Sequence, residues 1–349
     1  MEKQNKFIGY VGTYTKGASE GIYSFTLDTN EGKISDVKVA AKLDNPTYLT
    51  ISNDNKYLYA VAKKGDLGGV AAFSRTDQLT FVNQQLSEGA PPCHVSVDSQ
   101  NRYLFTGNYH KGTIEAYTLQ QENGSIAPNP SVAQHQGSGP DKRQEKPHAH
   151  YAAFTPDEKY VAAIDLGIDQ LITYELNHGQ LKEVSRLTVK PGSGPRHLVF
   201  HPSENIAYLM TEFSSEVLVL QYNPEDGSFA QLQAVSTIPA DFTENNQGSA
   251  IHISADGKFV YAGNRGHNSI AVLKVNEENQ QLSLVEYTPS EGDWPRDFVL
   301  DPTNQFIVGS NQESSNLVLF KRDGETGKLT LLNADITVPH AVCVKFLNY

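Results

Sequence analysis

Three arginines and one glutamate stand beside apolar runs in short repeated segments of this chain. Residues 192–212 read GSGPRHLVFHPSENIAYLMTE, with Arg196 just before one apolar run and Glu212 just after the next. Arg265 and Arg296 occupy similar positions beside later apolar runs. A forked guanidinium suits carboxylate or phosphate, whereas its common role is a surface or structural ion pair. Three arginines beside such runs in an acidic chain favour recognition of an anionic substrate.

A histidine pair accompanies these charges. His148 and His150 lie in the sequence KPHAH at residues 146–150. An imidazole near Glu212 would serve as a general acid or base near neutral pH. A pair of hydrogen-bonded loop histidines, or a weak metal-ligand pattern, is the alternative interpretation.

The elements that must position these residues are strand pairs. In residues 192–212, a Gly/Pro turn leads to a strand over 197–200, a polar turn over 201–205 and a second strand over 206–211. In an antiparallel pair, the start of one strand adjoins the end of the other, so Arg196 and Glu212 should meet at one edge.

The same pattern recurs along the whole chain, with a second hairpin signal after each strand pair. Four strands at this period are typical of a propeller blade. The pattern therefore predicts an all-β fold, a seven-bladed β-propeller with four-stranded blades, in one domain spanning residues 1–349. Equivalent points, 44 to 57 residues apart, are Pro46, Pro92, Ala149, Pro195, Gly248, Pro295 and Pro339.

The seventh copy stops after one strand, residues 341–346, and its missing partner stands at residues 7–13. We expect the C-terminal strand to be the innermost strand of the first blade and to close the ring, which removes two open edges.

In such a ring, the starts of the innermost strands and the ends of the second strands share one mouth of the central channel. This placement brings His148, Arg196, Glu212 and Arg265 together as candidate catalytic residues. Candidate substrate-binding residues at the same mouth are His150, Asp165, His197, Asn264, Arg296 and His340.

One connection is unusually long. Residues 127–146 are rich in Pro, Gly, Ser and charge. This segment is either a lid that carries Lys142 and Arg143 to the site or a solvated excursion.

Composition narrows the class of protein. The net charge of −12 disfavours nucleic acid and anionic membranes. No apolar run is long enough to span a bilayer and the N-terminus does not read as a signal peptide, so we expect a cytoplasmic protein. Its two cysteines, Cys93 and Cys343, are expected to be reduced packing residues. A closed ring needs no partner to fold, so a monomer is expected.

Six motifs together resemble the propeller-type 6-phosphogluconolactonase family, the seven-bladed lactonase group that also includes the fungal 3-carboxy-cis,cis-muconate lactonizing enzyme. They are GTYT (12–15), KPHAH (146–150), GPRH (194–197), TE (211–212), GNRG (263–266) and WPR (294–296). By resemblance, His148, Arg196, Glu212 and Arg265 match the group proposed as catalytic in the lactonizing enzyme.

The resemblance implies hydrolysis of 6-phospho-D-glucono-1,5-lactone, a phosphorylated sugar lactone, in the oxidative pentose phosphate pathway. Glu212 or His148 would activate water, Arg196 and Arg265 would stabilise the oxyanion, and Arg296 would hold the phosphate, helped by Lys142 or Arg143. We expect no metal or other cofactor, because the arginines would repel a cation. The alternatives are hydrolysis of another lactone, muconate-type cyclisation, a metal-dependent lactonase, and a non-catalytic binding scaffold.

Overall fold

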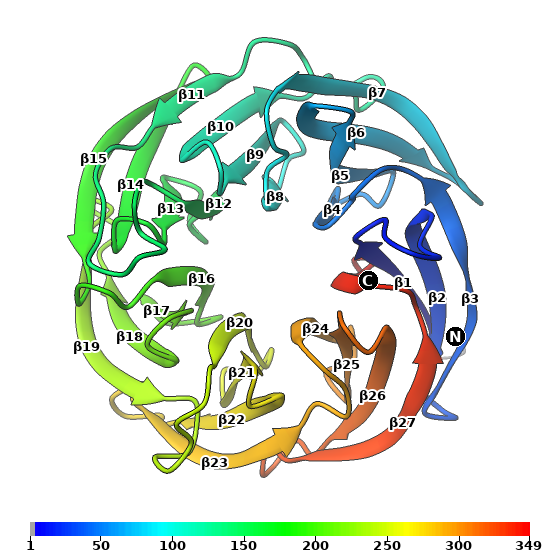
Figure 1. The fold of residues 1–349 in the computed structure, drawn as a ribbon, viewed down its shortest axis with the longest axis vertical. Coiled ribbons are helices and arrows are strands. Elements are labelled where there is room, and N and C mark those ends of the chain that lie inside the picture. Colours follow the sequence, from blue (N-terminus) through cyan, green and yellow to red (C-terminus); the bar gives the residue numbers. More distant parts are fainter. Residues whose placement is uncertain (1–3) are drawn as a thin grey trace.

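The computed structural model describes residues 4–349 as a ring of seven antiparallel sheets around a central channel (Figure 1). Each sheet has four strands, and the sheets follow one another around the ring in chain order. The predicted seven-bladed propeller is therefore confirmed. The single-domain prediction also includes residues 1–3, which lie outside the described residues.

The blades are numbered from the N-terminus, and their strands are given from the channel outward. Blade 1 consists of β28 (Ala341–Phe346), β1 (Lys6–Thr13), β2 (Gly21–Asp28) and β3 (Lys33–Lys42). Blade 2 consists of β4 (Leu49–Ile51), β5 (Tyr57–Lys64), β6 (Leu67–Arg75) and β7 (Leu79–Glu88). Blade 3 consists of β8 (His94–Val97), β9 (Tyr103–Asn108), β10 (Thr113–Thr118) and β11 (Ser131–Gln134). Blade 4 consists of β12 (Ala149–Phe154), β13 (Val161–Asp165), β14 (Gln170–Asn177) and β15 (Gln180–Thr188). Blade 5 consists of β16 (Pro195–Phe200), β17 (Ile206–Thr211), β18 (Glu216–Tyr222) and β19 (Phe229–Ser236). Blade 6 consists of β20 (Gln247–Ile253), β21 (Phe259–Arg265), β22 (Ser269–Val275) and β23 (Leu282–Pro289). Blade 7 consists of β24 (Pro295–Leu300), β25 (Phe306–Asn311), β26 (Asn316–Arg322) and β27 (Leu329–Thr337).

The core is divided into seven layers, one between each pair of neighbouring blades. In β17, Ile206, Tyr208 and Met210 pack toward blade 6, whereas Ala207 and Leu209 pack toward blade 4. Successive side chains of a strand point to opposite faces, so a strand buried on both faces must be apolar throughout. This requirement explains the unbroken apolar runs of the second strands.

The turns between the two inner strands are tied by one polar side chain each. Oγ of Ser52 accepts the N–H of Tyr57 at 2.9 Å, and Oδ1 of Asp301 accepts the N–H of Phe306 at 2.7 Å. The partners are five residues apart in both turns, which is the local signal that made the hairpins readable from the sequence.

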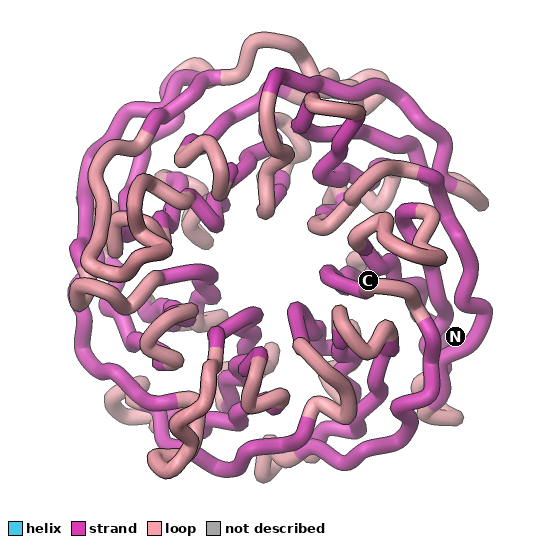
Figure 2. The backbone as a smooth tube through the Cα atoms, viewed as in Figure 1, coloured by secondary structure: helices cyan, strands magenta, loops and turns pink. Residues whose placement is uncertain are grey.

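Ring closure follows the prediction from the split repeat. β28 pairs antiparallel with β1, from Gly9 opposite Phe346 to Thr13 opposite Ala341. The C-terminal strand lies at the centre of the ring and completes the blade formed by the N-terminal strands (Figures 1 and 2).

The long connection predicted over residues 127–146 is in part a strand. Ser131–Gln134 forms β11, the outer strand of blade 3, so the connection proper is residues 135–148. It is anchored by the buried side chain of Gln144, whose Nε2 donates to the carbonyl of Leu166 at 2.8 Å.

None of the described residues forms a helix with the length and apolar character needed to cross a bilayer.

The closing strand generates a stability prediction. Val344 is fully buried in the layer between blades 7 and 1, whereas Val132 on β11 is 53% exposed. Val344→Ala should lower the free energy of unfolding by about 2 kcal/mol, because it removes buried methyl groups and leaves a cavity. Val132→Ala should change it by less than about 0.5 kcal/mol. Thermal unfolding followed by circular dichroism measures both; equal unfolding midpoints would contradict the role of β28 in closure.

Candidate active site

Three candidate residues occupy β-bulges at the starts of inner strands. In β16, Pro195 pairs with Thr211 and His197 with Met210, so Arg196 is the extra residue. His150 in β12 and Arg296 in β24 are extra residues in the same way. A bulge turns an unpaired residue out of the regular alternation, which here aims it at the channel.

The strongest interaction at this mouth is an ion triad. Oε2 of Glu212 lies 3.1 Å from Nε of Arg196 and 2.7 Å from Nη2 of Arg265. Backbone carbonyls also hold both guanidinium groups in place. Nη1 of Arg196 donates to the carbonyl of Ser249 at 2.7 Å, and Nη2 of Arg265 donates to the carbonyl of Gly248 at 2.7 Å. The predicted meeting of Arg196 and Glu212 is confirmed, and Arg265 joins them from the neighbouring blade.

The triad keeps Glu212 ionised. Burial alone would raise its pKa, but the charges of Arg265 and Arg196 outweigh burial, so its pKa lies below its ordinary value. Oε1 accepts no hydrogen bond from residues 4–349. Glu212 therefore presents one free carboxylate oxygen while the other is held by two cations.

Glu212 and Arg265 line a cavity of about 450 Å³, whereas Arg196 lines the adjoining space of about 30 Å³. The volume of the larger cavity lies within the usual range for small-molecule sites. Its lining residues come from the inner strands of all seven blades or from the connections beside those strands: Tyr14, Lys16, Asn45, Thr47, Pro91, Pro92, Cys93, Tyr109, His110, His150, Glu212, Gln247, Arg265 and Arg296.

Arg296 differs from the other two arginines. Within residues 4–349, no carboxylate lies within 4.0 Å of its guanidinium, and its Nε has no hydrogen-bond partner. Its Nη1 reaches Oε1 of Gln312 at 3.4 Å, and the guanidinium lies 5.8 Å from the ring centre of Tyr14. A partly buried cation without a counter-charge is available for an anionic ligand.

His150 lines the cavity as a neutral imidazole. It is buried, and its Nδ1 has no partner among the described residues. Burial, then the charges of Arg196 and Arg296, hold its pKa well below the ordinary value. A neutral imidazole can donate or accept a hydrogen bond at the cavity wall.

His148 does not line this cavity. Its ring stacks on Tyr109 with centroids 4.1 Å apart, Nδ1 lies 2.8 Å from the carbonyl oxygen of Tyr109, and Nε2 lies 3.3 Å from Oε2 of Glu145. The structure therefore places His148 behind Tyr109, where it supports a wall of the cavity.

Two other candidates lie in hydrogen-bond networks beneath the mouth. Oδ1 of Asp165 accepts the N–H of His148 at 2.7 Å, and Oδ2 lies 2.7 Å from Nδ1 of His135. Nδ2 of Asn264 donates to the carbonyl of Thr237 at 2.7 Å. Both residues fix the segments beside the site and do not line the cavity.

The remaining candidates also lie outside the cavity lining. His197 is buried in the channel beyond it, and the carbonyl of His340 accepts the N–H of Tyr14 at 3.1 Å. Arg143 pairs with Asp141 and stacks on Phe213 at 3.6 Å. Arg143 is thus occupied at the rim, and neither it nor Lys142 reaches the lining.

Sequence reasoning missed several lining residues. Tyr14 and Tyr109 each directly follow a second strand, after Thr13 and Asn108, and Gln247 begins an inner strand. The rule that strand starts and ends share one mouth would have found them if it had been extended by one residue. Lys16 and His110 stand further into the turns, where no periodic signal marks them.

Cys93 lines the cavity but is not activated. Burial raises the pKa of its thiol to about 12, although the charge of Arg196 opposes this. Both cysteines are free thiols, as expected. Within residues 4–349, no group of three His, Cys, Asp or Glu side chains is arranged to hold a metal ion; the metal-free site remains a prediction.

The structure is thus a seven-bladed propeller whose channel carries, at one mouth, a cavity lined by arginines and a carboxylate. Residues 8–346 match the family model described as lactonase, 7-bladed beta-propeller, and the chain belongs to this family.

Relatives match along nearly the full length. The chain is 56% identical to the 6-phosphogluconolactonase of Bacillus subtilis strain 168, over 98% of this chain and 99% of that protein. A solved structure of a Lactobacillus plantarum protein is 43% identical with a TM-score of 0.95, covering 98% of this chain and 99% of the other. The periplasmic gluconolactonase PpgL of Pseudomonas aeruginosa is 31% identical with a TM-score of 0.93, at the same coverage.

The triad generates a prediction about pH. Because the folded pKa of Glu212 is below its unfolded value, its ionised form stabilises the fold above about pH 4.5, and this contribution is lost as pH falls through the folded pKa. Glu212→Gln should therefore lower the unfolding midpoint most at neutral pH, and the difference from the unsubstituted protein should shrink below about pH 4. Thermal unfolding at several pH values measures this.

The matched control is Glu183→Gln, which removes an exposed pair with Arg186 and should have little effect at any pH. A Glu212→Gln difference that is independent of pH would contradict the assignment of Glu212 as a buried carboxylate held by two arginines.

Proposed function

We propose that this chain is a 6-phosphogluconolactonase that hydrolyses 6-phospho-D-glucono-1,5-lactone to 6-phospho-D-gluconate. The observation that carries the proposal is the combination, in one cavity, of a carboxylate with one free oxygen and an arginine without a counter-charge. The 56% identity to the Bacillus subtilis enzyme supports the choice of substrate.

In this proposal, Arg296 binds the phosphate. Its guanidinium has free N–H groups and no carboxylate partner within residues 4–349. A guanidinium matches two phosphate oxygens at once, which fixes the orientation as well as the affinity. Lys16, on the same cavity wall, adds a second positive charge.

Glu212 then acts as the base. Its Oε1 accepts a proton from a water molecule, whose oxygen attacks the lactone carbonyl carbon. The carbonyl oxygen becomes an oxyanion, which is stabilised by the N–H groups of Arg196 and Arg265 that are not used by Glu212 or the backbone. The bond between the carbonyl carbon and the ring oxygen breaks, and Glu212 gives the proton that it took from water to the ring oxygen.

Several finer points belong to the same proposal. The reaction serves the oxidative pentose phosphate pathway in the cytoplasm, and the protein works as a monomer without a metal or other cofactor. Ring closure by β28 supports the monomer, since it leaves the first and last blades no open inner edge. The net charge of −12 argues against nucleic acid or a membrane surface as a partner.

The direct test is hydrolysis of 6-phosphogluconolactone by chelator-treated protein, measured against a buffer blank because the lactone also hydrolyses spontaneously. Glu212→Gln should lower kcat by about 10²–10⁴-fold, the usual contribution of a general base. His148→Gln should lower it far less, because His148 supports the cavity wall from behind.

Circular dichroism checks that both variants keep the fold. A rate equal to the blank would overturn the proposed function. A larger loss in His148→Gln than in Glu212→Gln would transfer the role of base to the histidine.

Arg296 generates a separate prediction about specificity. Arg296→Met should raise KM for the phosphorylated lactone by about 10–100-fold, because a charge-assisted hydrogen bond is worth about 1.5–3 kcal/mol. KM for D-glucono-1,5-lactone, which has no phosphate, should not change. Lys142→Met is the matched control and should alter neither value, since Lys142 does not line the cavity. An equal change in KM for both lactones on Arg296→Met would show that Arg296 does not bind the phosphate.

A further inference from the structure

The channel contains a second cavity, of about 300 Å³, on the far side of a layer formed by Tyr48 and His197. Its walls are the later residues of the same inner strands whose starts form the first site, such as Val199 in β16 and Ser96 in β8. A space of about 30 Å³ within the layer separates the two cavities and shares Cys93 and Arg296 with the first. None of the proposed catalytic steps uses the second cavity.

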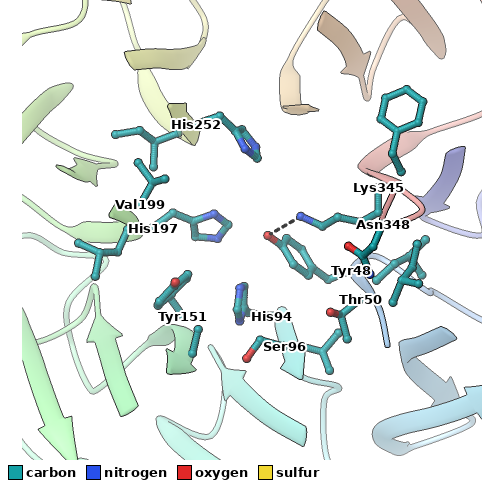
Figure 3. Close-up of a pocket in the computed structure, with 17 residues that line it drawn as sticks. Tyr48, Thr50, His94, Ser96, Tyr151, His197, Val199, His252, Lys345 and Asn348 are labelled. Carbon is teal, nitrogen blue, oxygen red and sulfur yellow. Dashed lines mark hydrogen bonds between the residues drawn. The ribbon is translucent and has the colours of Figure 1, made fainter. Parts of the chain in front are cut away.

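The cavity contains a cation without a close counter-charge. Nζ of Lys345 lies 3.5 Å from the hydroxyl of Tyr48 and 4.9 Å from the centre of that ring, and both side chains extend into the cavity from the same side (Figure 3). Within residues 4–349, no carboxylate oxygen lies within 4.0 Å of this ammonium. Burial would lower the pKa of Lys345, but Tyr48, Cys343 and Asp297 outweigh it and raise the pKa, so the group is charged at neutral pH.

Asp297 is the carboxylate that acts on the charge of Lys345, but its oxygens contact other groups. Its Oδ2 accepts the N–H of Val344 at 3.1 Å, and its Oδ1 lies 3.5 Å from Nε2 of His252. Asp297 is buried behind the wall and does not line the cavity. It offsets part of the charge of Lys345 without reaching the ammonium.

Three imidazoles point into the same space from blades 3, 5 and 6: those of His94, His197 and His252 (Figure 3). The N–H of Ala152 donates to Nδ1 of His94 at 3.4 Å, so the ring proton of His94 is on Nε2. Nε2 of His197, which is 6% exposed, has no partner among residues 4–349.

The first two of these histidines are neutral hydrogen-bonding groups. Burial, then the charges of Lys345 and Arg196, lower the pKa of His94 to about 3. Burial and Arg196 likewise hold the pKa of His197 well below its ordinary value. The groups converging on the cavity are thus one ammonium, a tyrosine hydroxyl and neutral imidazole nitrogens. Buried polar groups are normally satisfied, so this convergence calls for a ligand that accepts hydrogen bonds and carries negative charge.

We propose that this second cavity is a binding site for a small oxyanion, a phosphate or a carboxylate, held by Lys345 Nζ, the hydroxyl of Tyr48 and the imidazoles of His94 and His197. The ammonium supplies the counter-charge, and Tyr48, which accepts from Lys345, can donate its own proton to the anion. The site is separate from the proposed lactone site and does not rest on the proposed function.

The test uses inorganic phosphate and isothermal titration calorimetry in buffer free of phosphate and sulfate. The titrations use Arg296→Met as the parent protein, because Arg296 in the first cavity would also bind phosphate. The parent should bind phosphate, adding Lys345→Met should weaken binding by at least tenfold, and adding Lys345→Arg should weaken it less. Adding Lys182→Met, on the exposed outer strand β15, is the matched control and should have no effect. Equal phosphate binding with and without Lys345→Met, or no binding by the parent, would overturn the proposal.

A second measurement needs no substitution. Crystals of the unsubstituted protein soaked in tungstate should show an anomalous peak in the second cavity, with a tungstate oxygen within hydrogen-bond distance of Lys345 Nζ. The absence of this peak would overturn the proposal even if Lys345→Met failed to fold. Competition of D-gluconate with phosphate would assign carboxylates to the site as well, whereas lack of competition would restrict it to phosphate; either result supports an oxyanion site.

Discussion

The pairing of β28 with β1 is the constraint on which the rest of this structure depends. It joins the last inner strand to the first blade and completes the seventh of seven apolar layers between blades. Each layer is shared by two blades, so no blade buries its faces alone. Closure therefore fixes the radius of the channel, and with it the distances between side chains from blades that are far apart in the sequence.

The channel of this ring contains a concentration of positive charge, although the chain as a whole is negatively charged. The chain is acidic overall, but Arg196, Arg265, Arg296 and Lys345 lie along the channel with Glu212 and Asp297 as the buried carboxylates facing them. Burying cations is costly unless each has a partner. Glu212 offsets two of the arginines through a single oxygen, which leaves the charge of Arg296 at one mouth and that of Lys345 toward the other only partly offset.

The layer between the two cavities consists of aromatic and imidazole rings. His197 lies 5.1 Å from His150 on the side of the first cavity and 5.5 Å from His94 on the other, measured between ring centres. Tyr48 packs against His94 and His197 at 4.7 and 5.8 Å. A layer this thin links the electrostatics of the two sites, since the charge of Arg196 lowers the pKa of histidines on both sides of it. The channel thus has two polar compartments, and each contains at least one cation.

The sequence by itself determined the number of blades, the turns, the closing strand and the meeting of Arg196 with Glu212, because all of these follow from strand alternation and from pairing within a hairpin. The tertiary structure alone decided that Arg265 reaches Glu212 from the neighbouring blade, that His150 faces the cavity while His148 stacks behind Tyr109, and that Asp165 and Asn264 bind the backbone beneath the site. The physical reason is range: a bulge and a ring orientation depend on contacts with neighbouring blades, and those contacts exist only once the ring has closed.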